Sequence, residues 1–341
     1  MTADNSAELG LLEQTARDIL RDVAGQDPAK AWQLLTEAGL PLLAVPEPDG
    51  GGWLEAAAVV ARLAGEAGAD LPYGDAALVA APLLATAGMT LPTGVVVAAV
   101  ADDVTVTPEG DGVRVRGTLA RVPYGVMAER VVIVATSEDA DVVVALDPSS
   151  AEASAGRNIA GEPRDTLQVD AVVEAFAPAP EGARDELLRR GALARAVAMA
   201  GVADAALKAS VRYATERVQF GRPIAKQQAV QHLLAEAAAE VEAMRASADA
   251  AVAACAQDGF LTRRPLVAVA TAKAQAGASA EVVARLAHQV HGAIGTTREH
   301  PLHRLTLRLW SWRDDFGSER HWQRVLGDLA LESDPWTLVT E

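Results

Sequence analysis

The sequence predicts three successive regions: an α-helical N-terminal domain at residues 1–93, a β-domain at residues 94–180 and a C-terminal four-helix bundle at residues 181–341. Two observations carry this prediction. Apolar residues recur at the spacing of helices near both ends of the chain, whereas the middle alternates with a period of two, which is typical of strands. A chain of 341 residues is also too long for one ordinary core, so sub-domains with shared interfaces are expected.

The N-terminal region is expected to be helical, with one clear break. Residues 44–52 read Ala-Val-Pro-Glu-Pro-Asp-Gly-Gly-Gly, and Pro and Gly at this density interrupt a helix. Gly39 is a plausible C-cap for the helix that precedes this loop. The expected helices are residues 11–23, 29–39, 54–67 and 75–87.

The middle region is expected to form a compact β-domain. From Gly94 onward β-branched residues alternate or run together, and residues 108–112, Pro-Glu-Gly-Asp-Gly, are typical of a hairpin turn. Residues 177–182 read Ala-Pro-Ala-Pro-Glu-Gly and predict a stiff linker. The expected strands are residues 95–100, 104–107, 113–116, 130–135, 141–146 and 167–176.

The C-terminal region is rich in Ala, Leu and other helix formers. Its predicted helices are residues 186–215, 228–257, 264–290 and 318–331. Four antiparallel helices of this length are typical of a bundle.

Composition excludes several classes of function. Lys and Arg total 30 against 46 Asp and Glu, so the formal charge of −16 disfavours nucleic acid and anionic membrane surfaces as partners. The N-terminus lacks the pattern of a signal peptide, and the most apolar stretch, residues 76–89, is too short to span a bilayer. Cys255 is the only cysteine and is expected to fill a core, so no intrachain disulfide is expected. No His or carboxylate pair has metal-ligand spacing. We expect a cytoplasmic protein without a metal.

The first motif that carries chemistry is Arg217-Val-Gln-Phe-Gly-Arg, followed by a helix that begins at Gln228. Arg217 and Arg222 place two guanidinium groups near a glycine turn, and arginine suits bidentate contact with phosphate. Phe220 adds a flat apolar ring, and the N-terminal amides of the next helix favour an anion. The segment is therefore a candidate site for a pyrophosphate and a ring. The alternative is a solvated connection between two helices.

The second motif is Gln289-Val-His-Gly-Ala-Ile-Gly-Thr-Thr. Gly292 and Gly295 permit a tight turn and let a ligand approach the backbone. We interpret His288 and His291 as hydrogen-bonded packing residues and not as catalysts.

Together, the two motifs, their separation and the helix–β–helix order resemble the acyl-CoA dehydrogenase family. Residues 39–52 also resemble that family's Gly-Leu, Pro-Glu, Gly-Gly loop. The family signatures are Arg-x-x-Phe-Gly and Gln-x-x-Gly-Gly-x-Gly, and this chain departs only in Ala293, which replaces the second glycine of the latter.

This resemblance implies an FAD that belongs mainly to a neighbouring subunit. In the family, a glutamate removes the α-proton of an acyl-CoA thioester while a hydride passes from Cβ to the flavin. The resemblance implies Arg217 at the pyrophosphate, Phe220 near the adenosine end, Gln228 and Gln289 as hydrogen-bonding residues, and Gly292 and Ala293 as points of backbone approach.

The departures from the family pattern concern the base and the β-domain. Aligned with the family, the two usual positions of the catalytic glutamate fall on Gly317 and Gly191, and glycine has no group that accepts a proton. The family's flavin-binding loop after the first strand is missing, since residues 98–103 pass almost directly into the next strand. Residues 121–124, Arg-Val-Pro-Tyr, replace a Trp-Ile-Thr segment that covers the flavin.

We therefore expect a subunit without its own base, which resembles the smaller subunit of heteromeric actinobacterial acyl-CoA dehydrogenases of sterol side-chain degradation. A homologous full-length subunit would supply the glutamate in a heterotetramer with two copies of each subunit. The expected substrate is an acyl-CoA, specifically a steroid side-chain CoA ester. The resemblance also implies an electron-transfer flavoprotein as acceptor. Two alternatives stay open: a self-sufficient homomeric dehydrogenase with a relocated base at Glu319, and a flavin-free structural subunit.

Overall fold

The computed structural model describes residues 3–23, 25, 27–137 and 140–332, with no account of the side chains of residues 3–6. The chain divides into two compact units. Unit 1 comprises Met1–Val60 and Ala69–Ala194, and unit 2 comprises Ala61–Gly68 and Arg195–Glu341. Two helices, α3 (Leu54–Ala67) and α5 (Ala183–Glu216), contribute residues to both units. The borders of the three predicted domains stay a prediction.

The N-terminal part of unit 1 is helical, as predicted. The Asp27 side chain accepts a hydrogen bond from the Ala29 N–H at 3.0 Å and so caps α2. The predicted helix at residues 75–87 differs in kind, because η2 is a π-helix in which the Ala81 N–H bonds to the Ala76 carbonyl, five residues back. Apolar spacing alone does not distinguish such a turn from an α-helix. The elements are α1 (Ala3–Val23), α2 (Pro28–Glu37), η1 (Leu40–Leu42), α3, η2 (Gly74–Ala80) and α4 (Ala81–Thr86).

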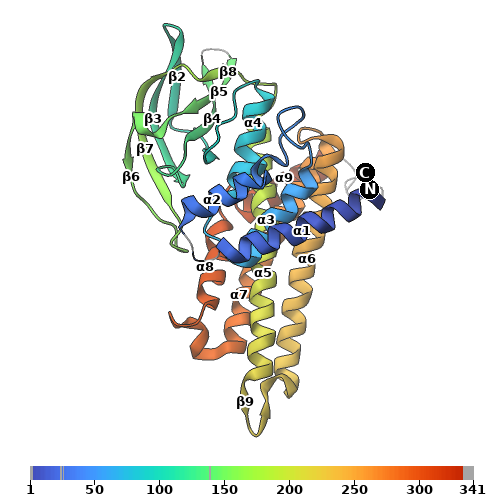
Figure 1. The fold of residues 1–341 in the computed structure, drawn as a ribbon. Coiled ribbons are helices and arrows are strands. Elements are labelled where there is room, and N and C mark those ends of the chain that lie inside the picture. The colour runs from blue at the N-terminus through green and yellow to red at the C-terminus, as the bar shows by residue number, and fades with distance from the viewer. Residues whose placement is uncertain (1–2, 24, 26, 138–139, 333–341) are drawn as a thin grey trace. The chain divides into compact units, whose positions relative to one another are not determined.

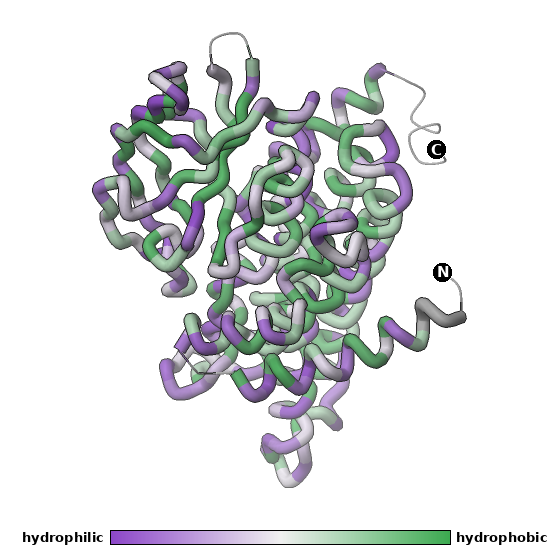
Figure 2. The backbone as a smooth tube through the Cα atoms, turned by 45° about the horizontal axis from the view of Figure 1, so that its top comes forward, coloured by the Kyte–Doolittle hydropathy of each residue, from purple (hydrophilic) through white to green (hydrophobic). Residues whose placement is uncertain are grey.

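A sheet follows, with the strand order β6-β7-β3-β2-β4-β5-β8 and β1 paired in parallel with β4. Valines are buried on both faces of β4 and β5. Figure 2 shows apolar residues in green along the strands of this sheet. The strands are β1 (Val96–Ala98), β2 (Val104–Glu109), β3 (Gly112–Pro123), β4 (Arg130–Ser137), β5 (Ala140–Leu146), β6 (Ala151–Ser154), β7 (Arg164–Val173) and β8 (Phe176–Pro178), with η3 (Pro148–Ser150) between β5 and β6.

Two predictions for this region need correction. Part of the expected linker at residues 177–182 is strand β8, which pairs with β5 and so continues the sheet. Pro is tolerated there because β8 lies at the end of the strand order, where one edge needs no ladder hydrogen bond. The short strand β6 was also not predicted.

Unit 2 is a helical bundle, and the predicted fold class is confirmed. Figure 1 shows α5, α6 and α7 running side by side, with the β9 hairpin at one end. The structure contains an additional helix, α8, that was not predicted. The elements after α5 are β9 (Val218–Gln219), β10 (Arg222–Pro223), η4 (Ile224–Lys226), α6 (Gln228–Asp258), α7 (Arg263–His291), η5 (Gly292–Thr296), α8 (Leu302–Trp312) and α9 (Glu319–Glu332).

Two searches of the described residues have negative results. None of the helices in this part of the chain is both long enough and apolar enough to cross a membrane. The same residues contain no group of three or more His, Cys, Asp or Glu side chains that is arranged to hold a metal ion.

Candidate functional site

The first motif folds into a short hairpin at one end of unit 2, and we call residues 217–223 the hairpin tip. Its two strands pair in antiparallel register. Phe220 and Gly221 form the turn, with φ angles of 53° and 77°. Positive φ at both positions suits the twist of a hairpin, but it costs a residue with a Cβ about 1–2 kcal/mol. Phe220 is nevertheless 91% exposed, so its ring gains no packing within the chain.

The hairpin tip also carries two arginines that form no ion pair with any described residue. Arg217 and Arg222 are both exposed. α6 begins close by at Gln228, and the residue before it, Gln227, makes no side-chain cap. The first backbone N–H groups of α6 therefore have no hydrogen-bond acceptor from the helix or from a capping side chain, as is typical of helix termini that bind anions.

A small apolar cluster joins the hairpin tip to the end of α7. Ala214 of α5, Ile224 of η4 and Val290 of α7 are buried together. The Ile224 N–H also donates to the Arg217 carbonyl at 2.8 Å, which closes the base of the hairpin. The tip is thus fixed to the segment that carries the second motif. Partly buried residues on this cluster are Tyr213, Ala225, Val230, Leu233 and Leu234.

The second motif ends α7 and begins η5. Gly292 caps α7 with φ 64°, and its N–H donates to the His288 carbonyl. Apart from its chain neighbours and the adjoining helix backbone, no described residue has an atom within 4 Å of the place that a Cβ would take at Gly292, so this backbone is open to a ligand. Gly295 serves packing instead, because a Cβ there would stand 2.8 Å from the Cβ of His291.

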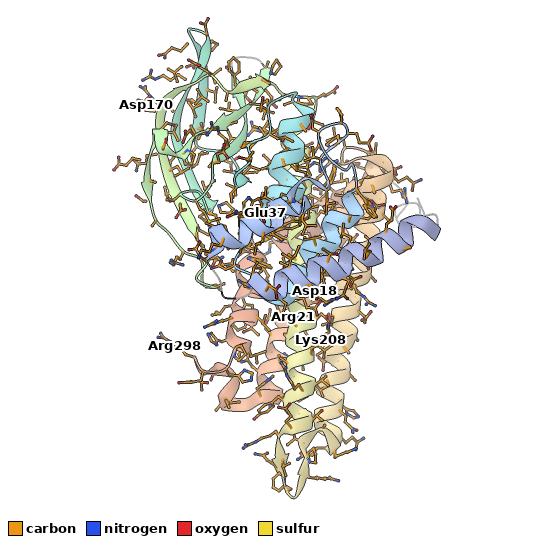
Figure 3. All side chains as sticks on the ribbon, in the orientation of Figure 1. Asp18, Arg21, Glu37, Asp170, Lys208 and Arg298 are labelled. Atoms are coloured by element: carbon orange, nitrogen blue, oxygen red, sulfur yellow. The ribbon has the colours of Figure 1, made fainter. Side chains whose placement is uncertain are left out.

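Gln289, Gly292 and Ala293 lie together in the wall of a cavity of about 870 Å³. Its volume falls within the range of small-molecule sites, roughly 300–1,000 Å³. Arg298 gives the wall a positive charge, and Figure 3 shows its side chain extending outward from its segment. Arg285 also lines the wall, but it pairs with Glu236 at 3.3 Å. The other lining residues are His288, Thr296, His303, Thr306, Leu307 and Trp310.

The structure therefore unites half of the predicted cofactor residues in one cavity wall. The other half, Arg217, Phe220 and Gln228, is not part of this wall and is exposed near the hairpin. The apolar cluster around Val290 nonetheless keeps both halves at the same end of unit 2.

Gly317, the first predicted base position, lies in a closed loop between α8 and α9. We call residues 313–319 the sealed loop. Gly317 has φ 94°, and a Cβ there would stand 2.7 Å from Trp322 Nε1 and 2.8 Å from His321 Cδ2. A glutamate therefore does not fit at this position in this conformation.

Lys273 of α7 holds the sealed loop from the inside. The residue is fully buried. Its Nζ donates to the carbonyl oxygens of Arg313 at 2.6 Å and of Gly317 at 2.8 Å. Burial lowers the pKa of Lys273 to about 8, against the opposing effect of the nearby Asp315 carboxylate.

An ion pair between Arg195 and Asp315 also holds this loop. Arg195 Nε donates to Asp315 Oδ2 at 3.1 Å, and both side chains are largely buried. The Arg195 guanidinium also lies 5.5 Å from the ring centre of Trp312 and 5.6 Å from that of Phe316. The Asp315 carboxylate is thus used within the chain.

Glu319, the alternative base, is engaged as well. Its Oε1 accepts a hydrogen bond from Arg313 at 2.8 Å, and its Oε2 is buried without a partner among the described residues. The side chain fits only because Gly277 faces it: a Cβ there would stand 2.8 Å from the Glu319 Cβ. The other predicted base position, Gly191, is buried within α5 in unit 1.

The connection where the family's flavin-binding loop is expected to be missing lies in unit 1 and is short. Residues 99–103 connect β1 to β2, and the connection is tied down by hydrogen bonds from the Ala99 N–H to the Val132 carbonyl and from the Thr118 N–H to the Asp103 carbonyl. Tyr124, in the segment that replaces Trp-Ile-Thr, is buried and its hydroxyl donates to the Asp70 carboxylate.

Sequence reasoning missed Lys273, Arg195 and the aromatic wall at Trp310. Lys273 has one signal that was available, because it lies among alanines on a helix face that is otherwise apolar. Arg195 and Trp310 have none, since their partners lie far away in the chain.

Comparison with known proteins agrees with the family resemblance that the sequence shows. Residues 183–312 match the family described as acyl-CoA dehydrogenase, C-terminal domain. Acyl-CoA dehydrogenase FadE27 of Mycobacterium tuberculosis is 31% identical over 309 residues, which is 81% of each protein. Among solved structures, a chain of the Tcur3481-Tcur3483 steroid ACAD is 28% identical with a TM-score of 0.83, covering 96% of this chain and 98% of that one. A chain of the ChsE4-ChsE5 complex from Mycobacterium tuberculosis has a TM-score of 0.85 at 23% identity, covering 98% and 99%. The chain belongs to the acyl-CoA dehydrogenase family.

Proposed function

We propose that this chain is one subunit of a heteromeric, FAD-dependent acyl-CoA dehydrogenase, and that it lends binding residues to an FAD at the subunit interface without supplying a base. One observation carries the proposal. At the hairpin tip, unit 2 exposes an aromatic ring and arginines that form no ion pair with a described residue, whereas the two positions that the family resemblance assigns to the catalytic glutamate are glycine.

The exposed groups fit a dinucleotide. Arg217, together with the uncapped amides at the start of α6, suits the charge of a pyrophosphate. Phe220 offers an exposed ring of the kind on which a nucleobase stacks. Gln228, the first residue of α6, is exposed and has both a donor and an acceptor.

The second motif completes this half-site. Gln289 offers an exposed amide, and Gly292 has open space around its backbone. Ala293, which replaces a family glycine, is also exposed. These residues would hold and orient the cofactor, and FAD would supply the acceptor for the hydride that leaves the acyl Cβ.

The sealed loop supports the absence of a base. Lys273 and the Arg195–Asp315 pair fill its interior, and Glu319 is bound to Arg313. A general base needs room for the proton that it removes. We therefore assign proton removal to a glutamate of a homologous full-length subunit.

Substrate and partner follow from relatives. The Tcur3481-Tcur3483 protein, 28% identical, is named as a steroid ACAD and as a pair of proteins, and its chain is matched almost end to end. This supports a steroid acyl-CoA as substrate and a second, unlike subunit as partner. A side-chain ester, a role in steroid or cholesterol degradation and a heterotetramer with two copies of each subunit belong to the same proposal. An electron-transfer flavoprotein as acceptor and a cytoplasmic location belong to the same proposal.

Flavin content tests the proposal. Three samples would be purified: the chain alone, the chain with a full-length acyl-CoA dehydrogenase homologue from the same genome, and the Arg217→Ala variant of the chain with that homologue. We expect no flavin in the chain alone and one FAD for each pair of unlike subunits in the complex. Loss of charge-assisted hydrogen bonds worth about 1.5–3 kcal/mol makes Arg217→Ala bind FAD roughly 10- to 100-fold more weakly.

The control is Arg245→Ala, which removes an exposed arginine of α6 that pairs with Glu242. This variant keeps its flavin in the proposed arrangement. Yellow, active protein from the chain alone would instead support a self-sufficient dehydrogenase. Unchanged flavin affinity in the Arg217→Ala complex would support a flavin-free structural subunit.

A further inference from the structure

Two histidine rings and a tyrosine ring lie between the two parts of the half-site. His291, the last residue of α7, stacks on Tyr213 of α5, with ring centres 4.6 Å apart and an angle of 23° between the planes. The His300 ring meets the edge of His291 at 4.7 Å. The Tyr213 carbonyl accepts from the Arg217 N–H at 2.8 Å, and Gly292 follows His291 directly. The stack therefore touches both cofactor motifs.

The hydrogen bonds of His291 define its protonation. Nδ1 lies 2.8 Å from the Ala287 carbonyl, which only accepts, so Nδ1 carries the proton. Nε2 is buried and has no partner among the described residues, and His291 as a whole is 3% exposed. A proton on Nε2 would place a buried donor and a positive charge where no acceptor stands.

We propose that His291 is a positioning residue that keeps the hairpin tip and the 289–293 segment in register through its stack on Tyr213, and that it does so only as a neutral ring. The proposal rests on the proposed function, because it concerns regulation of the same FAD half-site. Acid would then open the stack and release the cofactor.

The surroundings of His291 strengthen this dependence on pH. Burial lowers the pKa of His291, and the neighbouring His300 and His288 lower it further, while the bond to Ala287 opposes them. The pKa of His300 is also lowered, by burial and by Arg212 and His303. Burial, His303 and His300 lower the pKa of His288. The charged groups that act on these rings are thus histidines and one arginine, and none is a carboxylate.

The direction of the effect follows from these shifts. A histidine whose folded pKa lies below its unfolded value, about 6.5, binds more protons when unfolded between the two values. The neutral ring therefore contributes its full stabilisation above the unfolded pKa, and this contribution is lost as the pH falls through the folded pKa. The same sign holds for His288, His291 and His300.

The test compares FAD affinity of the co-purified complex at pH 7.5 and pH 5.5. We expect the complex to bind FAD up to about tenfold more weakly at the lower pH, because pH 5.5 lies about one unit below the ordinary pKa of histidine. His291→Phe keeps a stacking ring and cannot titrate, and His291→Gln keeps a donor for Ala287. Both variants are expected to lose most of this pH dependence. A His291→Phe complex with the same pH profile as the original would overturn the proposal.

Two further measurements separate the possible failures. His232→Gln removes an exposed histidine of α6 near the hairpin and is expected to leave the pH profile unchanged; loss of the profile in this variant would contradict our assignment to His291. Hydrogen exchange of the η5 amides, corrected for intrinsic rate, is expected to rise at pH 5.5 only in the original sequence. If Arg217→Ala releases FAD while His291→Phe changes nothing, the half-site stands and its regulation by His291 does not.

Discussion

The hairpin tip and the sealed loop both lie in unit 2, and both concentrate charged and aromatic side chains. At the tip, Arg217 and Arg222 have no partner among the described residues and Phe220 is 91% exposed. Against the sealed loop, Lys273 of α7 and Arg195 of α5 are buried, and each has acceptors in that loop.

This difference separates groups that serve a partner from groups that serve the fold. An exposed ring with a positive φ lowers the stability of the chain and gives no packing in return, so its use is expected outside the chain. A buried ammonium with two carbonyl acceptors has the opposite character, since its removal leaves those acceptors unsatisfied. The sealed loop is held by contacts within the chain, whereas the hairpin tip is exposed.

The largest expected effect is on the sealed loop. Lys273→Ala leaves the Arg313 and Gly317 carbonyls without their donor and creates a cavity, so we expect the free energy of unfolding to fall by about 3–5 kcal/mol. Urea unfolding of the purified complex measures it. The control is Lys208→Ala, in which an exposed lysine (Figure 3) loses its pairs with Glu66 and Asp204 at a cost of about 0–1 kcal/mol. Equal losses in both variants would contradict a structural role for Lys273.

A smaller effect, on binding and not on stability, is expected at the tip. Phe220→Ala removes an exposed ring, so unfolding should change by less than about 0.5 kcal/mol. FAD affinity of the complex should fall roughly tenfold, because stacking of a base on an aromatic ring contributes about 1–3 kcal/mol. Isothermal titration of the flavin-free complex measures this, with Val218→Ala as the matched control. If Phe220→Ala instead destabilised the chain and left affinity intact, the tip would be structural.

The sequence allowed the order of helices and strands to be predicted because periodicity is a local property. Helices α5, α6 and α7 begin and end within a few residues of their predicted bounds. Strand β8 was missed because alternating Pro and Ala resemble a linker, and only pairing with β5 makes the segment a strand. The π-helical turn η2 was missed for a similar reason, since its hydrogen-bond shift leaves the apolar pattern unchanged.

The candidate site shows the same limit more sharply. Alignment with a known family places the two usual positions of the catalytic glutamate at Gly317 and Gly191. That both residues are glycine is read directly from the sequence. The hydrogen bond from Lys273 to the Gly317 carbonyl in the sealed loop was not predictable, because the two residues are 44 positions apart and meet only in the folded chain. The stack of Tyr213 on His291 has the same origin in tertiary packing.

The most direct measurement of the central claim is turnover per bound FAD in the complex that contains Glu319→Gln. The partner supplies the base in our account, so we predict turnover within about twofold of the original complex and an unchanged flavin content. General-base catalysis contributes roughly 100- to 10,000-fold to rate. A loss of that size with flavin still bound would mean that this chain deprotonates the substrate itself, and would contradict the account.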